Sequence, residues 1–174
     1  MLKKIKDKIL KIQLNRSKSK VYTQKQFTTW AQTQKIGILF RYKDINNSFS
    51  IGKFAHNIEW KGKTVQWLCF IDEEKKQQVQ DENILTFSPK DISLSASTNN
   101  NSLANFCNTE FDYLFSIQFE ENIYLKWVLL NCKSKCLAGL YNENNLLDLM
   151  LVNKNLDSID EVIQEIVTLI KKIK

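Results

Sequence analysis

Residue types that perform acid–base or nucleophilic chemistry are sparse in this sequence. His56 is the only histidine, and it lies beside apolar residues in a predicted helix, so we interpret it as a surface or boundary residue rather than a catalytic base. The acids at positions 72–74 are adjacent in a polar segment, a pattern typical of solvated carboxylates. No serine lies in a nucleophile-elbow motif. We therefore predict no catalytic residue. Whether the protein is an enzyme stays open, although the sequence favours a non-catalytic one.

Cysteine spacing gives one candidate metal motif. Cys132 and Cys136 are four residues apart, which is compatible with half of a zinc site. The remaining cysteines, Cys69 and Cys107, are distant in sequence, and a tetrahedral site needs four ligands. We therefore predict free thiols and no metal, in keeping with a reducing compartment.

Two acids are embedded in apolar, strand-like runs. These are Asp112 and Asp148, and a carboxylate in such a place needs hydrogen-bond partners. We expect both to accept hydrogen bonds from nearby backbone amides rather than to serve as catalytic acids.

Glycine placement argues against the common phosphate-binding loops. The chain has four glycines, and the first strand is followed by none until Gly52. Dinucleotide and P-loop sites need glycines directly after an early strand, so that backbone amides approach the phosphates. We predict neither motif and no cofactor.

The elements that would position any site alternate between strands and helices. Short apolar runs predict strands at 36–40, 65–71, 84–87, 111–117, 136–141 and 146–152. Helical spacing predicts helices at 23–34, 46–62, 103–108, 122–134 and 159–172, with a polar loop or short helix at 72–81 and a mobile loop at 95–102. This alternation predicts an α/β fold: a three-layer Rossmann-like sandwich whose mostly parallel sheet of about five or six strands has helices on both faces.

Ligands of such sheets bind beyond the carboxyl ends of the strands, which the sequence places at 41–44, 72–74, 88–90, 118–121 and 141–143. Polar side chains at those ends therefore form the predicted pocket, if there is one: Arg41, Asp72, Ser88, Gln118 and Tyr141.

The N-terminal segment carries more than the entire net charge. The chain has a charge of +6, yet residues 1–20 hold eight basic residues and one acid, which gives +7 and leaves −1 for residues 21–174. We predict two parts, a basic N-terminal helix with its connector at 1–20 and a single α/β domain at 21–174. The cationic residues expected to contact a partner are Lys3, Lys4, Lys8, Lys11, Arg16, Lys18 and Lys20.

Three interpretations of this basic helix stay open. Leu2, Ile5, Ile9 and Ile12 recur at spacings of three and four, with lysines on the opposite face. The apolar stripe packs on the domain in the first interpretation, and the lysines bind RNA or the ribosome in the second. In the third, the helix lies on an anionic membrane surface. We favour RNA or ribosome docking as the function, with a small-ligand or nucleotide-sugar-binding domain and membrane-surface association as alternatives.

No apolar run approaches the roughly 20 residues that span a bilayer, and lysines interrupt the N-terminus where a secretory signal is continuously apolar. We therefore predict a cytoplasmic protein without a transmembrane helix. Its oligomeric state is not determined by the sequence.

Two resemblances accompany these patterns. The runs KIGILF at 35–40, FDYLF at 111–115 and LDLM at 147–150 resemble a small uncharacterised bacterial family, a domain of unknown function with a lysine-rich N-terminus. That resemblance implies a cytoplasmic α/β protein and no particular activity. Residues 111–117, the following helix and the GLY run at 139–141 are similar to a segment in the N-terminal half of lipopolysaccharide heptosyltransferases, which implies a Rossmann-like fold.

Overall fold

Six strands form the centre of the molecule in a computed structural model that describes residues 2–17, 27–45, 60–72, 81–141, 146–152 and 155–173. In α1 the side chains described are those of residues 5–15. The strands are β1 (Lys35–Arg41), β2 (Thr64–Phe70), β3 (Ile84–Phe87), β4 (Glu110–Ile117), β5 (Lys133–Leu140) and β6 (Leu149–Leu151). The helices are α1 (Leu2–Ser17), α3 (Asn101–Asn108), α4 (Ile123–Asn131) and α5 (Ile159–Lys171).

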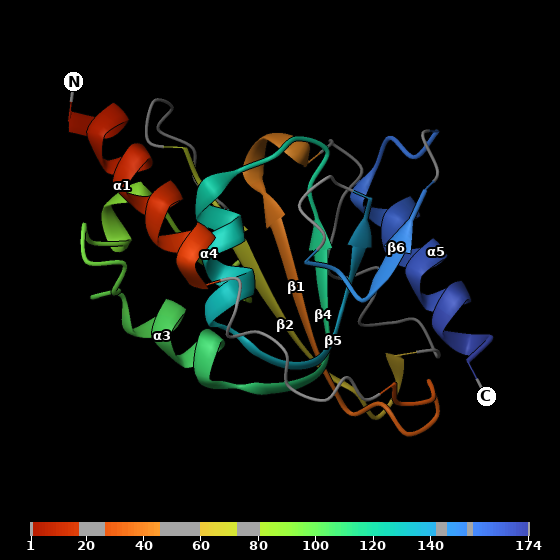
Figure 1. Cartoon of the computed structure of the whole chain (residues 1–174). Coiled ribbons are helices and arrows are strands. Elements are labelled where there is room, and N and C mark those ends of the chain that lie inside the picture. Colours follow the sequence, from red (N-terminus) through yellow and green to blue (C-terminus); the bar gives the residue numbers. More distant parts are fainter. Residues whose placement is uncertain are drawn as a thin grey trace.

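The sheet has the strand order β3-β2-β1-β4-β5-β6, and each neighbouring pair is parallel (Figure 1). This is the order of a doubly wound Rossmann sheet, which confirms the predicted fold class. The chain builds outward from β1 in one direction and then returns to build outward from β4 in the other. The boundary between β1 and β4 is therefore the topological switch point, where such sheets bind ligands.

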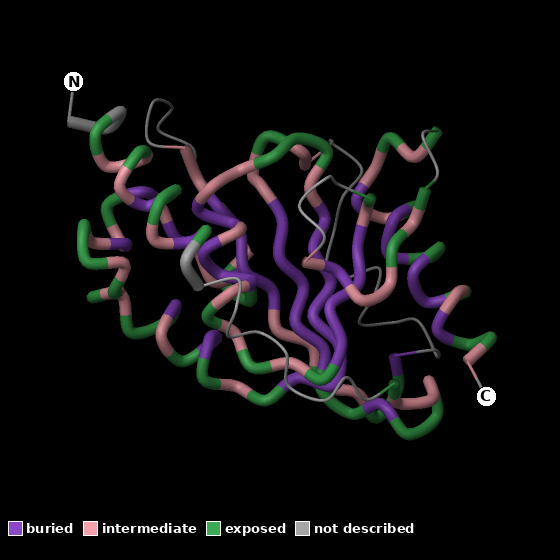
Figure 2. Tube along the Cα trace, viewed as in Figure 1, coloured by how far each residue is buried: buried purple, intermediate pink, exposed green. Residues whose placement is uncertain are grey.

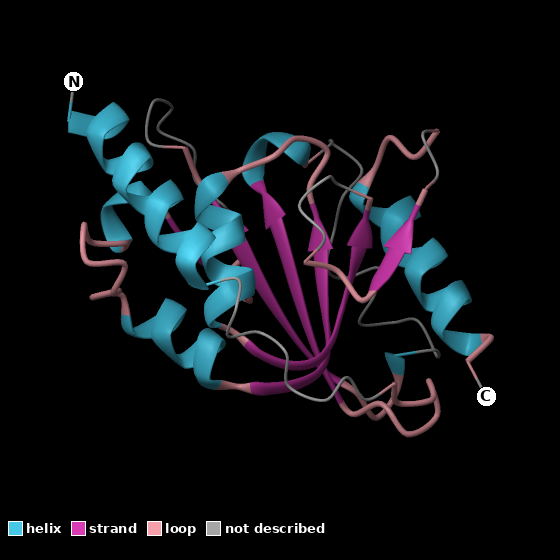
Figure 3. Ribbon diagram, in the orientation of Figure 1, coloured by secondary structure: helices cyan, strands magenta, loops and turns pink. Residues whose placement is uncertain are grey.

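Helices cover both faces of the sheet, giving three layers (Figure 3). Helices α1, α3 and α4 lie over one face, and α5 lies over the other. Buried residues concentrate in the central strands (Figure 2). Their apolar side chains form one core cluster on each face of the sheet. Strand β4 is buried from Phe111 to Ile117, as expected for a strand covered on both sides.

Local sequence explains where the helices start. Ser158 and Glu161 form a capping box at the start of α5, as their spacing indicates. At the start of α4 the Asn122 side chain accepts hydrogen bonds from the N–H groups of Tyr124 and Leu125. Helix α4 is apolar nearly all round and is largely buried, which confirms the expectation for this segment.

One predicted helix is wrong where the structure describes it. Residues 27–34 of the expected helix at 23–34 form a turn, closed by the N–H groups of Gln32 and Thr33 on the Thr29 carbonyl. The side chain of Lys63, which lies just before β2, binds two other carbonyls of this segment: its Nζ donates hydrogen bonds to the carbonyls of Trp30 and Thr33. A helix would need some of these carbonyls for its own ladder, so tertiary contacts outweigh the local helical pattern.

Other expectations fall partly outside the described residues. Residues 46–59 of the helix predicted at 46–62 lie outside the described residues. So do residues 73–80 of the polar segment predicted at 72–81. The loop predicted at 95–102 is irregular as far as residue 100, and its Thr98 bridges to Ile92.

Candidate functional site

Two cationic side chains share one carboxylate at the switch point. Arg41 ends β1, and Lys43 lies in the 3₁₀ helix η2 (Tyr42–Asp44) that follows. Arg41 Nη1 lies 3.3 Å from Glu120 Oε2, and Lys43 Nζ contacts the same oxygen. The Arg41 side chain is 11% exposed, whereas that of Glu120 is 67% exposed. The cations are thus placed by β1, and their partner projects from the segment after β4.

Asp44 is the second acid at this edge. Burial raises the pKa of Asp44, although the charges of Arg41 and Lys43 oppose that shift. Its Oδ2 atom is buried and has no hydrogen-bond partner among the described residues. Glu120 is the carboxylate that contacts both cations directly.

A pocket of about 290 Å³ lies at the same edge, beyond the carboxyl ends of β4, β5 and β6. Its lining is mostly apolar and consists of Gln118, Phe119, Leu140, Tyr141, Leu151, Val152 and Leu156. Phe119, Tyr141 and Val152 are 37%, 55% and 73% exposed, so three large apolar side chains face solvent around it. Gln118 contributes an amide whose Nε2 donates to Ser116 Oγ at 2.6 Å.

The structure separates the five residues predicted for a pocket. Gln118 and Tyr141 line the pocket, and Arg41 lies at the switch point. Asp72 lies just after β2, whereas the Ser88 side chain forms a capping box with Asp91 at the start of the 3₁₀ helix η4 (Pro89–Asp91). Ser88 is therefore engaged in holding a local turn.

Of the other residues at this edge, Lys43, Asp44, Phe119 and Glu120 lie within the predicted strand ends at 41–44 and 118–121 but were not assigned to the pocket, and Val152 was assigned to the strand at 146–152. All of them lie within three residues of a strand end.

The N-terminal helix α1 packs on the domain beside α4 (Figure 1). Leu10 and Leu14 are each 2% exposed and belong to the core cluster on this face of the sheet. Polar contacts accompany this packing: the Tyr124 hydroxyl donates to Asp7 Oδ1 at 2.6 Å, and Gln13 Nε2 donates to the Leu94 carbonyl at 3.2 Å. Helix α1 is therefore part of the helix layer that contains α3 and α4 (Figure 1).

The predicted packing face of α1 is wrong. Ile5 and Ile12, assigned to the stripe that packs, are 50% and 54% exposed. Leu10 and Leu14 point to nearly the opposite side of a helix that turns 100° per residue. The helix has apolar residues on two faces, and the leucines fit the surface of α4. Sequence spacing alone could not choose between the faces.

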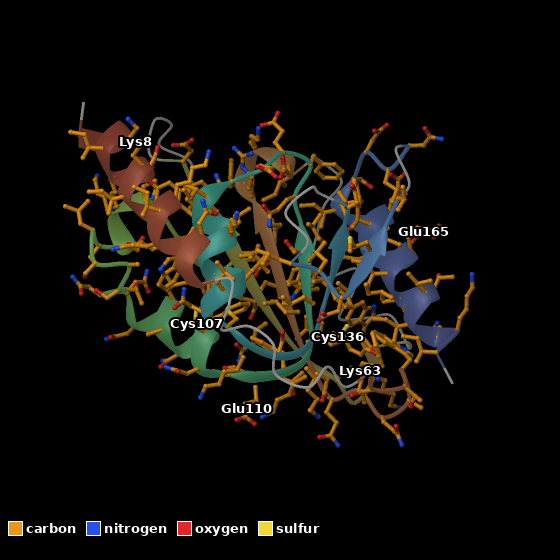
Figure 4. The ribbon with its side chains drawn as sticks, viewed as in Figure 1. Lys8, Lys63, Cys107, Glu110, Cys136 and Glu165 are labelled. Carbon is orange, nitrogen blue, oxygen red and sulfur yellow. The ribbon has the colours of Figure 1, made fainter. Side chains whose placement is uncertain are left out.

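The predicted cationic contacts have different surroundings. Lys8 and Lys11 are exposed, and Figure 4 labels Lys8 on the outer helix layer. Lys6, which was not assigned to a partner, donates to the Pro89 carbonyl. The side chains of Lys3, Lys4 and Arg16, and the whole of Lys18 and Lys20, lie outside the described residues.

The cysteine pair proposed as half of a metal motif is divided between two faces of the sheet. Cys136 belongs to the core on the α5 side, whereas Cys132 packs on the α4 side, with its Sγ 3.5 Å from Cys107 Sγ. Burial raises the pKa of Cys132 well above its usual value. In the part of the chain that the structure describes, no three His, Cys, Asp or Glu side chains cluster as metal ligands would.

The two embedded acids behave as expected. Asp112 Oδ2 accepts hydrogen bonds from the N–H groups of Gln34 and Lys35 at 2.8 and 2.9 Å. Asp148 Oδ2 accepts one from the Leu137 N–H at 2.8 Å. Both carboxylates therefore bind backbone amides, which confirms their predicted role.

Among the described residues, none of the helices combines the length and apolar character needed to span a bilayer. No curated protein and no solved structure matches the chain at a significant level. One family model does match, and it covers residues 6–173. Because this range includes the six strands, the carboxyl edge, helices α3, α4 and α5, and α1 from residue 6 onward, the chain belongs to the Family of unknown function (DUF6913).

Proposed function

We propose that the protein has a non-catalytic role and docks through α1 onto an anionic membrane surface. The observation that carries the proposal is the exposure of Ile5 and Ile12 on a helix that is already anchored by Leu10 and Leu14. A helix that only packed on its domain would leave a polar outer face. Here two large apolar side chains, Ile5 and Ile12, are exposed beside Lys8 and Lys11.

The geometry of this outer face suits a lipid interface. Ile5 and Ile12 are seven residues apart, which places them two turns apart on one side of α1. Lys8 lies between them in sequence and is exposed, as is Lys11. In an interfacial helix the isoleucines enter the boundary of the acyl chains while lysine stems extend to the anionic headgroups.

The expected affinity is modest. Completing the burial of two half-exposed isoleucines contributes about 1 kcal/mol each, and each lysine near an anionic leaflet contributes about 1 kcal/mol. Docking would therefore be reversible and would weaken at high salt.

RNA or the ribosome is the partner that the charge pattern alone favoured. Lysines serve either partner, because they are attracted both to nucleic-acid phosphates and to anionic lipid headgroups. The isoleucines separate the two, since an apolar side chain gains nothing from a phosphate backbone. Their exposure is why we place the membrane first. RNA binding and a cytoplasmic location remain predictions.

The test is flotation with vesicles of phosphatidylcholine containing 30% phosphatidylserine, beside vesicles of phosphatidylcholine alone. We expect the full chain to float with the anionic vesicles only, and 0.5 M salt to release it. The double variant Ile5→Ser/Ile12→Ser should lose most of this binding. Val152→Ser is the matched control, because it removes an apolar side chain that is 73% exposed at another part of the molecule.

A parallel filter-binding measurement with poly(U) covers the competing partner. Retention of poly(U) that is unchanged in Ile5→Ser/Ile12→Ser, together with absence of vesicle flotation, would overturn the membrane proposal in favour of RNA. Circular dichroism checks that each variant keeps its helix content.

A further inference from the structure

The carboxyl edge of the sheet combines features that α1 docking leaves unexplained. Arg41 and Lys43 converge on one oxygen of Glu120 at the switch point. The pocket of about 290 Å³ adjoins this cluster along the chain, since Gln118 and Phe119 line the pocket and Glu120 follows them directly. Residues 118–120 therefore connect the apolar pocket to the carboxylate that pairs with Arg41 and Lys43.

The partner of the two cations is easily displaced. Glu120 is 67% exposed, and an ion pair this open to water contributes about 1 kcal/mol or less. Arg41, by contrast, is 11% exposed and lies at the end of β1, so its side chain has less room to move than that of Glu120 when their ion pair opens. A planar guanidinium suits the oxygens of carboxylates and phosphates.

The second acid at this edge, Asp44, is a single carboxyl beside the two cations Arg41 and Lys43. Asp44 is partly buried with one oxygen unpartnered among the described residues, and burial raises its pKa. When Glu120 swings away, the local charge is therefore positive. An incoming anion would neutralise it.

We propose that this edge binds a small organic anion with an apolar, ring-bearing body. The anionic group takes the place of the Glu120 carboxylate beside Arg41 and Lys43, and the body enters the pocket between Phe119 and the ends of β5 and β6. The pocket is at the small end of the range for ligand sites, which limits the body to about three rings. The absence of a glycine-rich turn after β1 disfavours a nucleotide diphosphate.

The test compares two probes with the same ring system and different charge: 1-anilinonaphthalene-8-sulfonate and neutral N-phenyl-1-naphthylamine. Binding to the full chain is followed by fluorescence, and the site is mapped by ¹⁵N amide shifts. We expect the sulfonate to bind more tightly, with shifts at Phe119, Tyr141 and Val152. Competition with benzoate and phenyl phosphate then separates carboxylate from phosphate ligands.

Glu120→Gln is the decisive variant. It removes the internal competitor, so the sulfonate should bind about twofold to fivefold more tightly while the neutral probe is unaffected. Glu110→Gln is the matched control, an exposed acid at the amino end of β4 and thus at the other edge of the sheet (Figure 4). Phe119→Ala should weaken both probes.

Three outcomes would overturn the proposal. These are equal affinity for the two probes, no effect of Glu120→Gln, and amide shifts on α1 instead of the carboxyl edge. Because Glu120 is exposed, its variant stays informative even if Phe119→Ala fails to fold.

Discussion

Asp112 of β4 is 8% exposed. Its carboxylate connects the amino-terminal parts of β4, β1 and β5 through hydrogen bonds. Its Oδ2 binds the amides at the start of β1, and its Oδ1 accepts a hydrogen bond from Lys135 of β5 at 2.7 Å. Burial alone would raise the pKa of Asp112. The hydrogen bonds from Lys135, Lys35 and Gln34 lower it and together outweigh the effect of burial, so the pKa lies below its usual value. Folding and ionisation of this group are therefore linked.

Replacing Asp112 by Asn should lower the free energy of unfolding by about 1–3 kcal/mol at pH 7, because a charged acceptor with three partners is lost. The folded pKa is below the unfolded value of about 3.9, so the stabilisation is present above that pH and is lost as the pH falls through the folded pKa. Urea unfolding of both proteins between pH 7 and pH 2.5 measures this. The difference between them should shrink toward the acid end.

The same series with Glu110→Gln controls for the loss of a charge, since Glu110 is exposed on the same strand. A difference between Asp112→Asn and wild type that stayed constant with pH would contradict the assigned ionisation.

At the scale of elements, strands β4 and β5 approach closely at Gly139, which pairs with Ser116. A Cβ atom at Gly139 would lie 2.3 Å from the Ser116 carbonyl oxygen, a backbone atom that cannot move alone. At Gly37 of β1 a Cβ would lie 2.8 Å from Leu114 Cδ1, the end of a flexible side chain. A side chain at Gly139 would therefore displace backbone, whereas one at Gly37 would displace a side chain.

Gly139→Ala should therefore destabilise the protein strongly, by about 3 kcal/mol or more, because β5 must separate from β4. Gly37→Ala should reduce stability by about 1–2 kcal/mol, since Leu114 can shift within the core. Chemical denaturation of both variants tests the ranking, and a smaller effect at Gly139 than at Gly37 would contradict the close approach.

At the scale of the whole molecule, the placement of α1 makes it part of the core. Leu10 and Leu14 share a buried cluster with residues of α3 and α4. Deleting residues 1–17 should lower the free energy of unfolding by about 3–6 kcal/mol, because two buried leucines lose their contacts. Thermal and urea unfolding of the shortened chain measure this loss.

The control for this deletion is Ile5→Ser/Ile12→Ser, which should change stability by about 0.5 kcal/mol or less since both side chains are half exposed. A shortened chain as stable as the full one would instead mean that α1 is a separable arm, as the boundary predicted at residue 20 implies.

The site at the carboxyl edge was predictable in part. Arg41, Gln118 and Tyr141 were identified because residues following parallel strands meet at one edge of the sheet. Ser88 was assigned to the same edge by that rule, yet its side chain caps a local turn. Glu120 lies in the predicted strand end at 118–121, but its ion pairs were not predicted, because they join residues 77 and 79 positions apart, a proximity that spacing along the chain does not encode.

The sequence by itself determined the α/β class, the six strands and the buried character of α4, because apolar run length and capping residues are local signals. It also determined that the charge is concentrated before residue 20. The tertiary structure decided the strand order, the turn at 27–34 and the face of α1 that packs. Each of these depends on which distant surface a segment meets, and two apolar faces of one helix differ only in their fit to α4.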